Sequence, residues 1–371
     1  MQITLDSQTL RAGLATVKHA IDNNSLIPIL SHVLLKTTGS DRLQIVGGNM
    51  EMELQTEVQA SLEKPGFVAL PVRPLIGLCQ SVPNDIPIAI TVGKVRATIQ
   101  AGHSRFTLPY LPGEDYPRIA PDQAKTTFTM AAGRLGNAIG LVRHAMAQHD
   151  TRYFLNGMLW ELAQDHLVFV GADGHRLAMH TEPVLAASLA SDAQIIVPFN
   201  GIRALASILT NVDEETVIHA DISSAHLRLS QGPEWTMTTK LIDGRFPDYG
   251  RIMPRDQPIH ITVDIAEMKT MLERVTLVTA QGSGIPAVRL NLDAETLQAS
   301  VNTQESSAQD QMPVLGQGTI TDMGLNARYL LDVLSILPGP TARIALTDHT
   351  LPFTVRPLDA DDTICVVMPL K

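Results

Sequence analysis

The sequence has few cysteines, few aromatic residues and no long apolar run, and each shortage excludes a class of protein. Two cysteines in 371 residues make neither a disulfide framework nor a zinc site. Aromatic residues are only 4% of the chain, so its cores must be aliphatic. A run of ~18 apolar residues, as a membrane helix needs, does not occur. The start, MQITLDSQTLRAG, lacks a basic segment followed by an apolar one. We therefore expect a reduced, cytoplasmic protein.

The length of the chain limits its number of domains, and its net charge limits its possible partners. A chain of 371 residues suits two or three domains, and 44% hydrophobic residues are enough to pack them. The net charge of −10 taken alone argues against nucleic acid as a partner. That inference fails if the charge is unevenly distributed along the chain.

One order of predicted elements occurs three times. A short strand precedes an amphipathic helix, and further strands follow the helix. In the first copy the helix stripe is Leu10, Leu14, Val17 and Ile21, with Ser7 as the expected N-cap. The same spacing returns in two later stripes: Leu135, Ile139, Val142 and Met146, and then Met268, Leu272, Val275 and Thr279. A second strand–turn–helix segment also recurs, at 68–78, 195–205 and 323–334.

This regular period predicts three tandem α+β domains, each with two helices packed on antiparallel sheets. Polar, proline-containing segments near 117–125 and 254–258 separate the copies. We therefore expect domains at 1–121, 122–254 and 255–371. Tandem copies placed side by side tend towards an arc or a ring.

The predicted helices are unevenly charged. The chain has 38 acidic residues, yet none falls within 7–21, 72–82, 131–147 or 200–210. The cations in these helices are Arg11, Lys18, Arg73, Arg134, Arg143 and Arg203. Such a surface is typical of weak contact with a phosphate backbone that does not depend on base sequence. Chance remains an alternative, because the helices of the third copy carry Glu267, Glu273 and Asp332.

Candidate catalytic groups lack partners. His149 and Asp150, followed by Tyr153, suggest acid–base chemistry, but no nucleophile motif accompanies them. Asp173 to Arg176 offers one histidine without a second metal ligand nearby. No GK[ST] follows Gly47-Gly48, so this is not a phosphate loop. An enzyme acting on DNA or carbohydrate stays an alternative that would need converging carboxylates or a metal set.

Two apolar surfaces stand apart from the predicted cores. On the helix at 264–279, Leu277, and more marginally Val278, lies opposite the buried stripe. Phe106 and Leu108 offer a complementary surface on the first copy, beside Arg96 and Arg105. These residues are candidates for a subunit contact, although a single exposed leucine is also common.

Six motifs carry a resemblance to a known family: LIPIL (26–30), HSRFTLPYLPGEDYP (103–117), HDTRYFLNGML (149–159), ADGHRLAM (172–179), KLIDGRFPDY (240–249) and CVVMPLK (365–371). They occur in order along the full chain. The sequence resembles the bacterial DNA polymerase III beta subunits, the sliding clamps.

The resemblance implies a ring without catalysis, cofactor or metal. Two three-domain chains would pair head-to-tail into a pseudo-sixfold ring, with helices lining the hole and sheets outside. The ring would be loaded by an ATP-dependent clamp loader, encircle double-stranded DNA regardless of sequence and tether the replicative polymerase. A specialised copy, for instance one that confers antibiotic resistance, fits the same motifs.

Family partners insert a short hydrophobic peptide between the second and third domains. Matched by motif, that groove would comprise Leu155, Gly174, His175, Arg176, Leu177, Pro247, Arg251, Ile252, Tyr329, Val366, Met368 and Leu370. Aliphatic pockets would take the anchors, and Arg176 and Arg251 would supply donors at the rim. Leu155, Leu177 and Val366 could also be ordinary core residues.

The resemblance also adds residues to the two sets proposed above, the DNA-facing cations and the subunit contact. It adds Asn24, His149, Tyr153 and Phe154 to the DNA-facing residues, and Glu305 to the dimer contact. Some positions depart from the family pattern. Ala172 stands where threonine is frequent, and Asn24 stands where an arginine often reaches DNA. Gln304, Ser306 and Ser307 replace positions that are often acidic, so the dimer would depend more on apolar contacts than on ion pairs.

Overall fold

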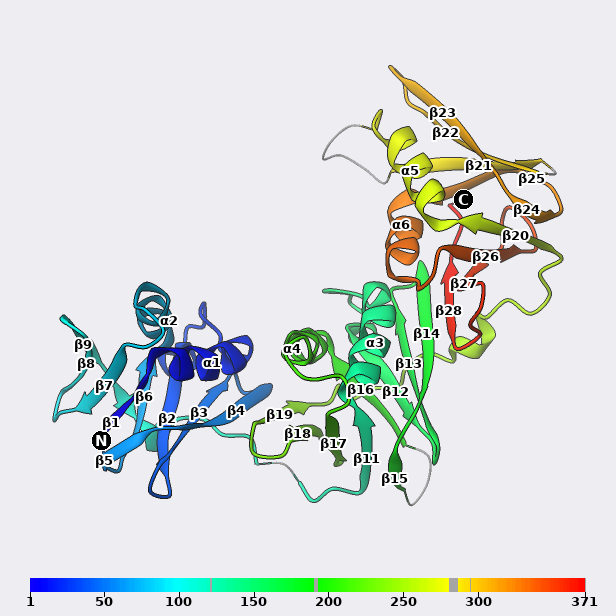
Figure 1. Ribbon diagram of the computed structural model, residues 1–371. Helices are drawn as coiled ribbons and strands as arrows, with labels where there is room; N and C mark the ends of the chain where they lie inside the picture. Colours follow the sequence, from blue (N-terminus) through cyan, green and yellow to red (C-terminus); the bar gives the residue numbers. More distant parts are fainter. Residues whose placement is uncertain (121, 190–192, 280–285, 294, 371) are drawn as a thin grey trace. The chain divides into compact units, whose positions relative to one another are not determined.

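The computed structural model describes residues 1–120, 122–189, 193–279, 286–293 and 295–370 (Figure 1). The chain forms two compact units. Unit 1 comprises residues 1–133, 184–192 and 203–241, and unit 2 comprises 134–183, 193–202 and 242–371. The domain bounds 1–121, 122–254 and 255–371 remain a prediction, and the first boundary, at residue 121, lies outside the described residues.

The predicted threefold order of elements is present. The first copy contains β1 (Gln2–Asp6), α1 (Ser7–Val17), β2 (His32–Thr38), β3 (Arg42–Gly48), β4 (Met52–Gln59), β5 (Ser61–Lys64), β6 (Phe67–Pro71), α2 (Val72–Ser81), β7 (Pro87–Val92), β8 (Arg96–Ala101), β9 (Ser104–Pro109) and β10 (Leu111–Pro112).

Within the described residues, the second and third copies repeat this order without an equivalent of β10. The second contains β11 (Thr126–Ala131), α3 (Ala132–Val142), β12 (Gly157–Leu162), β13 (His166–Ala172), β14 (Arg176–Pro183), β15 (Ala186–Ser188), β16 (Ala193–Pro198), α4 (Phe199–Leu209), β17 (Val217–Ile222), β18 (His226–Gln231) and β19 (Trp235–Lys240). The third contains β20 (Ile259–Asp264), α5 (Ile265–Thr276), β21 (Ala287–Asp293), β22 (Thr296–Asn302), β23 (Ser307–Pro313), β24 (Leu315–Gln317), β25 (Ile320–Asn326), α6 (Ala327–Ile336), β26 (Thr341–Leu346), β27 (Phe353–Pro357) and β28 (Thr363–Val367).

The start of the first helix corrects one prediction. Asp6, not Ser7, is the N-cap of α1, because its carboxylate accepts the backbone N–H of Thr9 at 2.7 Å. Ser7 is buried, and its hydroxyl donates to the carbonyl of Pro83 at 2.7 Å. The helix also ends earlier than predicted, since Lys18–Ala20 continue it as a 3-10 turn.

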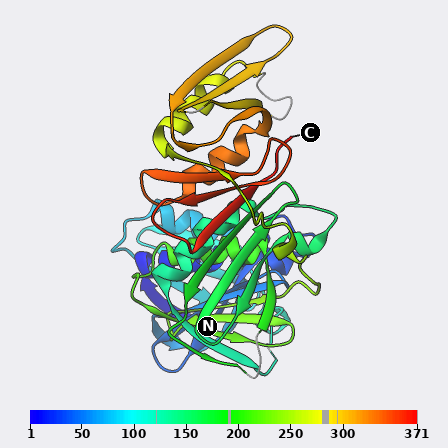
Figure 2. The ribbon, with the colours of Figure 1, turned by 90° about the vertical axis from the view of Figure 1, so that its right-hand side faces the viewer.

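Each copy builds two antiparallel sheets, and in two places a sheet passes from one copy into the next. In unit 1, β4 of the first copy pairs with β19 of the second within a ten-stranded sheet. In unit 2, β14 of the second copy pairs with β28 of the third within a nine-stranded sheet (Figure 2). The remaining five-stranded and four-stranded sheets end at β9 and β23, respectively.

The sheet of unit 2 has a helix face and an outer face. Arg134 of α3 pairs with Glu182 of β14, and Asp332 of α6 pairs with Arg176 of the same strand, so α3 and α6 cover one face. Leu177 alternates with Arg176 and therefore points to the other side. Among the described residues, no helix is both long and apolar enough to span a membrane.

The cross-strand partners at the strand joints are buried as completely as core residues. In unit 1, Leu54 of β4 and Met237 of β19 are cross-strand partners and are both buried. In unit 2, Ala178 of β14 and Cys365 of β28 have the same relation. Each joint therefore adds buried apolar area to its backbone hydrogen bonds.

We expect Leu54→Ala to lower the free energy of unfolding of unit 1 by about 2–5 kcal/mol, because it opens a cavity at the joint. Urea unfolding can be followed by the fluorescence of Trp235 in a Trp160→Phe background. Leu26→Ala, at a fully exposed side chain, is the matched control. A loss no larger than that of the control would show that this joint contributes little.

Candidate functional site

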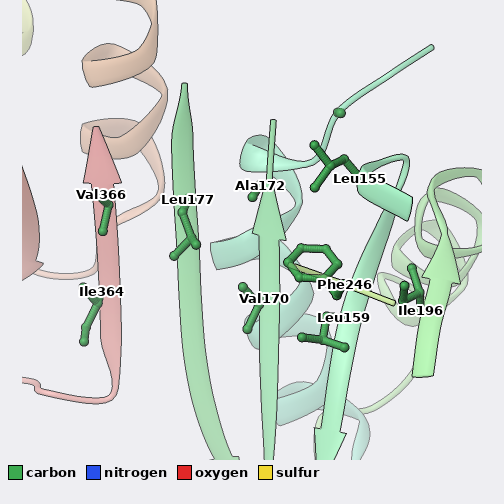
Figure 3. Close-up of a cluster of buried hydrophobic side chains, with 10 residues drawn as sticks. Leu155, Leu159, Val170, Ala172, Leu177, Ile196, Phe246, Ile364 and Val366 are labelled. Carbon is green, nitrogen blue, oxygen red and sulfur yellow. The ribbon is translucent and has the colours of Figure 1, made fainter. Parts of the chain in front are cut away.

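An apolar cluster lies on the outer face of the sheet of unit 2, where β14 meets β28. We call it the junction cluster, and its buried members are Ala147, Leu155, Leu159, Val170, Ala172, Leu177, Ile196, Phe246, Ile364 and Val366. Figure 3 shows Leu177 of β14 between Val366 of β28 and Ala172 of β13, as the strand register requires. Because side chains alternate between the two faces of a strand, every second residue of these strands points to this face, and those residues form most of the cluster.

The segment after β19 covers part of the junction cluster. Phe246 is buried in the cluster, while Ile242, Tyr249 and Met253 pack against it. The backbone N–H of Ile242 donates to the carbonyl of Ile196 at 2.9 Å, and the Tyr249 hydroxyl donates to the carboxylate of Glu161. Burial and this carboxylate raise the pKa of Tyr249 above its ordinary range.

Exposed residues stand near members and packed partners of the cluster in the chain. Ile252 and Met368 are 43% and 36% exposed, and Pro247 and Arg251 also reach solvent. The C-terminal segment is held in place, because the N–H of Met368 donates to the carbonyl of His175 at 2.9 Å. Buried aliphatic groups thus lie beside solvent-exposed ones, which is the composition of a surface that can take apolar anchors.

The buried part of the predicted groove is Leu155, Leu177 and Val366, which belong to the junction cluster and are at most 3% exposed. Tyr329 and Leu370 are half-buried, and Gly174 and His175 are exposed. Several cluster members were not predicted. Phe246, Ile196 and Ile364 could have been found from strand alternation and from the DGRFP motif, but their convergence depends on tertiary pairing.

Arg176, predicted as a donor at the rim of the groove, is engaged with groups of the protein itself. Its guanidinium donates to Asp173 at 3.0 Å and to Asp332 at 2.6 Å, and it lies over the ring of Tyr329, 4.6 Å from the centroid. The His175 ring stacks on the same tyrosine with centroids 6.0 Å apart. Arg176 therefore fastens α6 of the third copy to the second copy from the helix face.

The turn before β14 requires glycine. Gly174 has a φ of +87°, and a Cβ there would lie 2.8 Å from a guanidinium nitrogen of Arg152. Arg152 in turn donates to the Asp150 carboxylate at 2.8 Å and to the carbonyl of Asp173 at 3.1 Å. The Asp173-Gly174 turn is thus a support for the joint, rather than the metal or phosphate site considered from the sequence.

A polar network crosses the joint on the helix face. His180 of β14, 2% exposed, contacts Thr363 of β28 at 2.7 Å and Glu182 at 3.0 Å. Glu182 also accepts from Arg134 at 3.0 Å. Burial alone would raise the pKa of Glu182, but the hydrogen bonds from His180 and Arg134 outweigh it, and the pKa lies below its ordinary value.

His144 lies behind the same joint, in a 3-10 turn (Arg143–Ala145) after α3. Both its ring nitrogens are buried. Burial, and then the positive charge of Arg176, lower its pKa to about 4. The ring is therefore neutral at physiological pH.

Tyr153 and Phe154, which were both predicted to face DNA, differ in exposure. Tyr153 is 56% exposed, whereas Phe154 packs against the junction cluster. The 3-10 turn Tyr153–Leu155 directs neighbouring side chains in different directions. His149 is exposed and has a φ of +58°.

The predicted DNA-facing cations fall into two groups. Three are held by the protein: Arg11 donates to the carbonyls of Cys79 and Val82, Arg73 contacts Asn23 and Asn24 at 3.4 Å, and Arg134 pairs with Glu182. Lys18, Arg143 and Arg203 are exposed and form no ion pair with any described residue. Helices α1 to α4 contain no acidic residue within their observed bounds.

The predicted dimer residues lie on or near the edge strands β9 and β23. Phe106 (40% exposed) and half-buried Leu108 are on β9, with exposed Arg105 beside them and Arg96 on β8. Leu277 is 81% exposed just after α5, and Val278 is half-buried. Glu305 is exposed in the turn before β23, and on β23 itself Asp310 pairs with Arg274 at 2.7 Å.

The described residues offer little catalytic chemistry. They contain no group of three His, Cys, Asp or Glu side chains placed to hold a metal ion. Burial raises the pKa of Cys79 to about 11 and of Cys365 to about 12, so neither thiol is an activated nucleophile.

Tandem α+β copies whose sheets continue from one copy into the next, with four helices free of acidic residues, are the architecture of a clamp-type protein. Family profiles of the DNA polymerase III beta subunit match along the chain: the N-terminal domain at residues 1–120, the central domain at 129–248 and the C-terminal domain at 250–371. The chain belongs to the DNA polymerase III beta subunit family and consists of three tandem clamp domains.

Individual relatives agree with this assignment. The beta sliding clamp of Pseudomonas aeruginosa is 35% identical and that of Escherichia coli is 30% identical, each over 100% of both chains. A structure of the P. aeruginosa clamp bound to griselimycin has a TM-score of 0.94 at 33% identity, covering 100% of this chain and 99% of that one. The Caulobacter crescentus clamp has a TM-score of 0.91 at 30% identity, with both chains fully covered.

We expect the stability of unit 2 to fall as the pH drops from 6.5 towards 4. The unfolded chain protonates His144 near pH 6.5, but the folded chain does so only near pH 4, so the unfolded state gains a proton first. His144→Gln should remove about 1.5 kcal/mol of the loss seen between pH 6.5 and about pH 5.

The measurement is urea unfolding followed by Trp160 in a Trp235→Phe background. His103→Gln, at an exposed position in unit 1, is the control and should keep the wild-type pH dependence of unit 2. An unchanged pH profile in His144→Gln would contradict the assignment.

Proposed function

We propose that the chain acts as a sliding clamp in the cytoplasm: a homodimeric ring around double-stranded DNA that tethers the replicative polymerase and performs no reaction itself. A clamp loader would place the ring on DNA, and partner proteins would dock by short peptides at the junction cluster. The observation that carries this proposal is the strand order at the two internal joints.

Both internal joints follow one rule. The last strand of one copy, β19 or β28, pairs antiparallel with the fourth strand of the preceding copy, β4 or β14. The corresponding strands that remain are β9 of the first copy and β23 of the third, and both end their sheets. A second chain, placed head-to-tail, would pair β9 with β23 twice and close a ring with no open joint.

The side chains at these edges support the same pairing. Phe106 is opposite Ile99, and Leu108 is opposite Ala97, so both extend the buried face of their sheet. Leu277 follows α5, the helix that packs against β23. At the internal joint of unit 1, Met237 of β19 and Leu54 of β4 are buried against each other, so pairing of β9 with β23 would remove Phe106 from water in the same way.

We expect Leu277→Ala with Val278→Ala to give monomers at micromolar concentration, because the change removes apolar contact without disturbing the fold of unit 2. Native mass spectrometry reads the oligomeric state directly. The control is Leu185→Ala, at a position 60% exposed and far along the chain from both edges. If the double variant remains a dimer, the interface lies elsewhere.

DNA would be held by the helices without reading of bases. Lys18, Arg143 and Arg203 are the cations available for phosphates, because Arg11 and Arg134 are engaged within the protein. A closed ring is tested by topology. After loading by a clamp loader and ATP, it should stay on circular DNA at high salt and leave when the DNA is linearised. Loss from circular DNA at the same rate would refute encirclement.

The junction cluster supports peptide docking. Leu177 and Val366 provide an aliphatic floor, and exposed Ile252 and Met368 lie at its border. The griselimycin complex of the P. aeruginosa clamp is consistent with a ligand-binding surface in this family.

We expect Met368→Ala with Ile252→Ala to weaken binding of a peptide with leucine and phenylalanine anchors by about 10–100-fold, because two apolar contacts are truncated. Fluorescence anisotropy with a labelled peptide gives the affinity. Leu351→Ala, 45% exposed in the same unit, is the control, and all variants should remain dimeric. Unchanged peptide affinity in the double variant would rule out this docking surface.

A further inference from the structure

Unit 2 has a basic surface cavity that the proposed function leaves unused. We call it the basic pocket. It measures about 570 Å³, and its lining includes Arg255, Gln257, His260, Arg343, Thr354 and Arg356. Three of these residues are arginines, and none of the described lining residues is acidic. In a chain with a net charge of −10, such a concentration of positive charge stands out.

The fold holds the three arginines together. Arg343 of β26 and Arg356 of β27 are direct cross-strand partners, an arrangement that destabilises a sheet when both charges have the same sign. Gln257 fixes the segment that carries Arg255, since its side chain donates to the carbonyl of Ala345 and accepts from the Thr354 hydroxyl at 2.7 Å. None of the three guanidinium groups forms an ion pair with a described residue.

The basic pocket lies on the same sheet face as the junction cluster. Paired residues of antiparallel strands point to the same side, and the pairs run from Leu177 to Val366, then to Thr354, Ala345 and His260. Two strand spacings, roughly 10 Å, separate β28 from β26. An extended peptide covers that distance in about three residues.

We propose that the basic pocket binds the acidic flank of a partner peptide whose apolar anchors occupy the junction cluster. This inference rests on the proposed docking function and adds a chemical preference to it: carboxylates about three to five residues from the anchor. A peptide fits better than nucleic acid, because the acid-poor helix α3 lies on the opposite face of this sheet. Guanidinium groups in a shared concavity bind carboxylates through charge-assisted hydrogen bonds.

The test uses the full chain and matched labelled peptides. All carry the same leucine and phenylalanine anchors, and a triplet of aspartate or of asparagine stands before or after them. We expect wild type to prefer an aspartate peptide over its asparagine match by about tenfold at low salt, with the preference shrinking at high salt. Arg343→Gln with Arg356→Gln should abolish the preference and leave affinity for the asparagine peptides unchanged.

The control removes two exposed cations from unit 1, by Arg42→Gln with Lys64→Gln, and should keep the preference. The Tm of the Arg343/Arg356 variant should not fall, because the change removes like-charge repulsion. Equal affinity of wild type for aspartate and asparagine peptides would overturn the inference and leave the docking function standing. The inference would also be overturned if a single-stranded oligonucleotide bound in a way that depends on Arg343 and Arg356 while the peptides showed no preference. Failure of every peptide to bind would overturn both.

Discussion

The antiparallel pairing of β14 with β28 is the interaction on which the rest of unit 2 depends. It joins strands nearly two hundred residues apart into one sheet, with Leu177 opposite Val366 and Arg176 opposite Val367. Because the side-chain period of a strand is two, this register also decides which residues reach each face. A slip of one residue would exchange the apolar floor of the junction cluster for the charged side chains of the helix face.

The two faces of this joint are built from different chemistry. On the outer face, aliphatic side chains and Phe246 exclude water, and their stabilisation is non-directional. On the helix face, Arg176 and His180 make directional contacts with groups of the third copy. Polar groups this deeply buried destabilise a protein unless they are paired, so the network fixes one relative position of β14 and β28. An exposed apolar border beside a fixed joint is well suited to bind a partner without rearrangement.

Positive charge is arranged differently on the helices and on the outer face of unit 2. The helices α1 to α4 have no acidic residues, yet several of their arginines are engaged in holding the fold. The free positive charge is therefore smaller than composition suggests, which favours mobile contact with phosphates over tight binding. The outer face carries a separate group of arginines, at Arg255, Arg343 and Arg356, where the sheet places like charges together. Like charges placed opposite each other do not stabilise a sheet, so binding of a ligand explains their presence better than a role in stability does.

The sequence by itself determined the threefold order of strands and helices, because alternation and helical stripes are local patterns that survive in any tertiary setting. Its motifs were also specific enough to indicate the family and the segments that meet at the junction cluster. Tertiary structure decided what those patterns cannot contain. The pairing partner of β14, the engagement of Arg176 with Asp332, and the turn of Phe154 towards the cluster all depend on residues far apart in the chain. The pairing of Arg343 with Arg356 was also decided by tertiary structure, since only the strand register places these residues opposite each other.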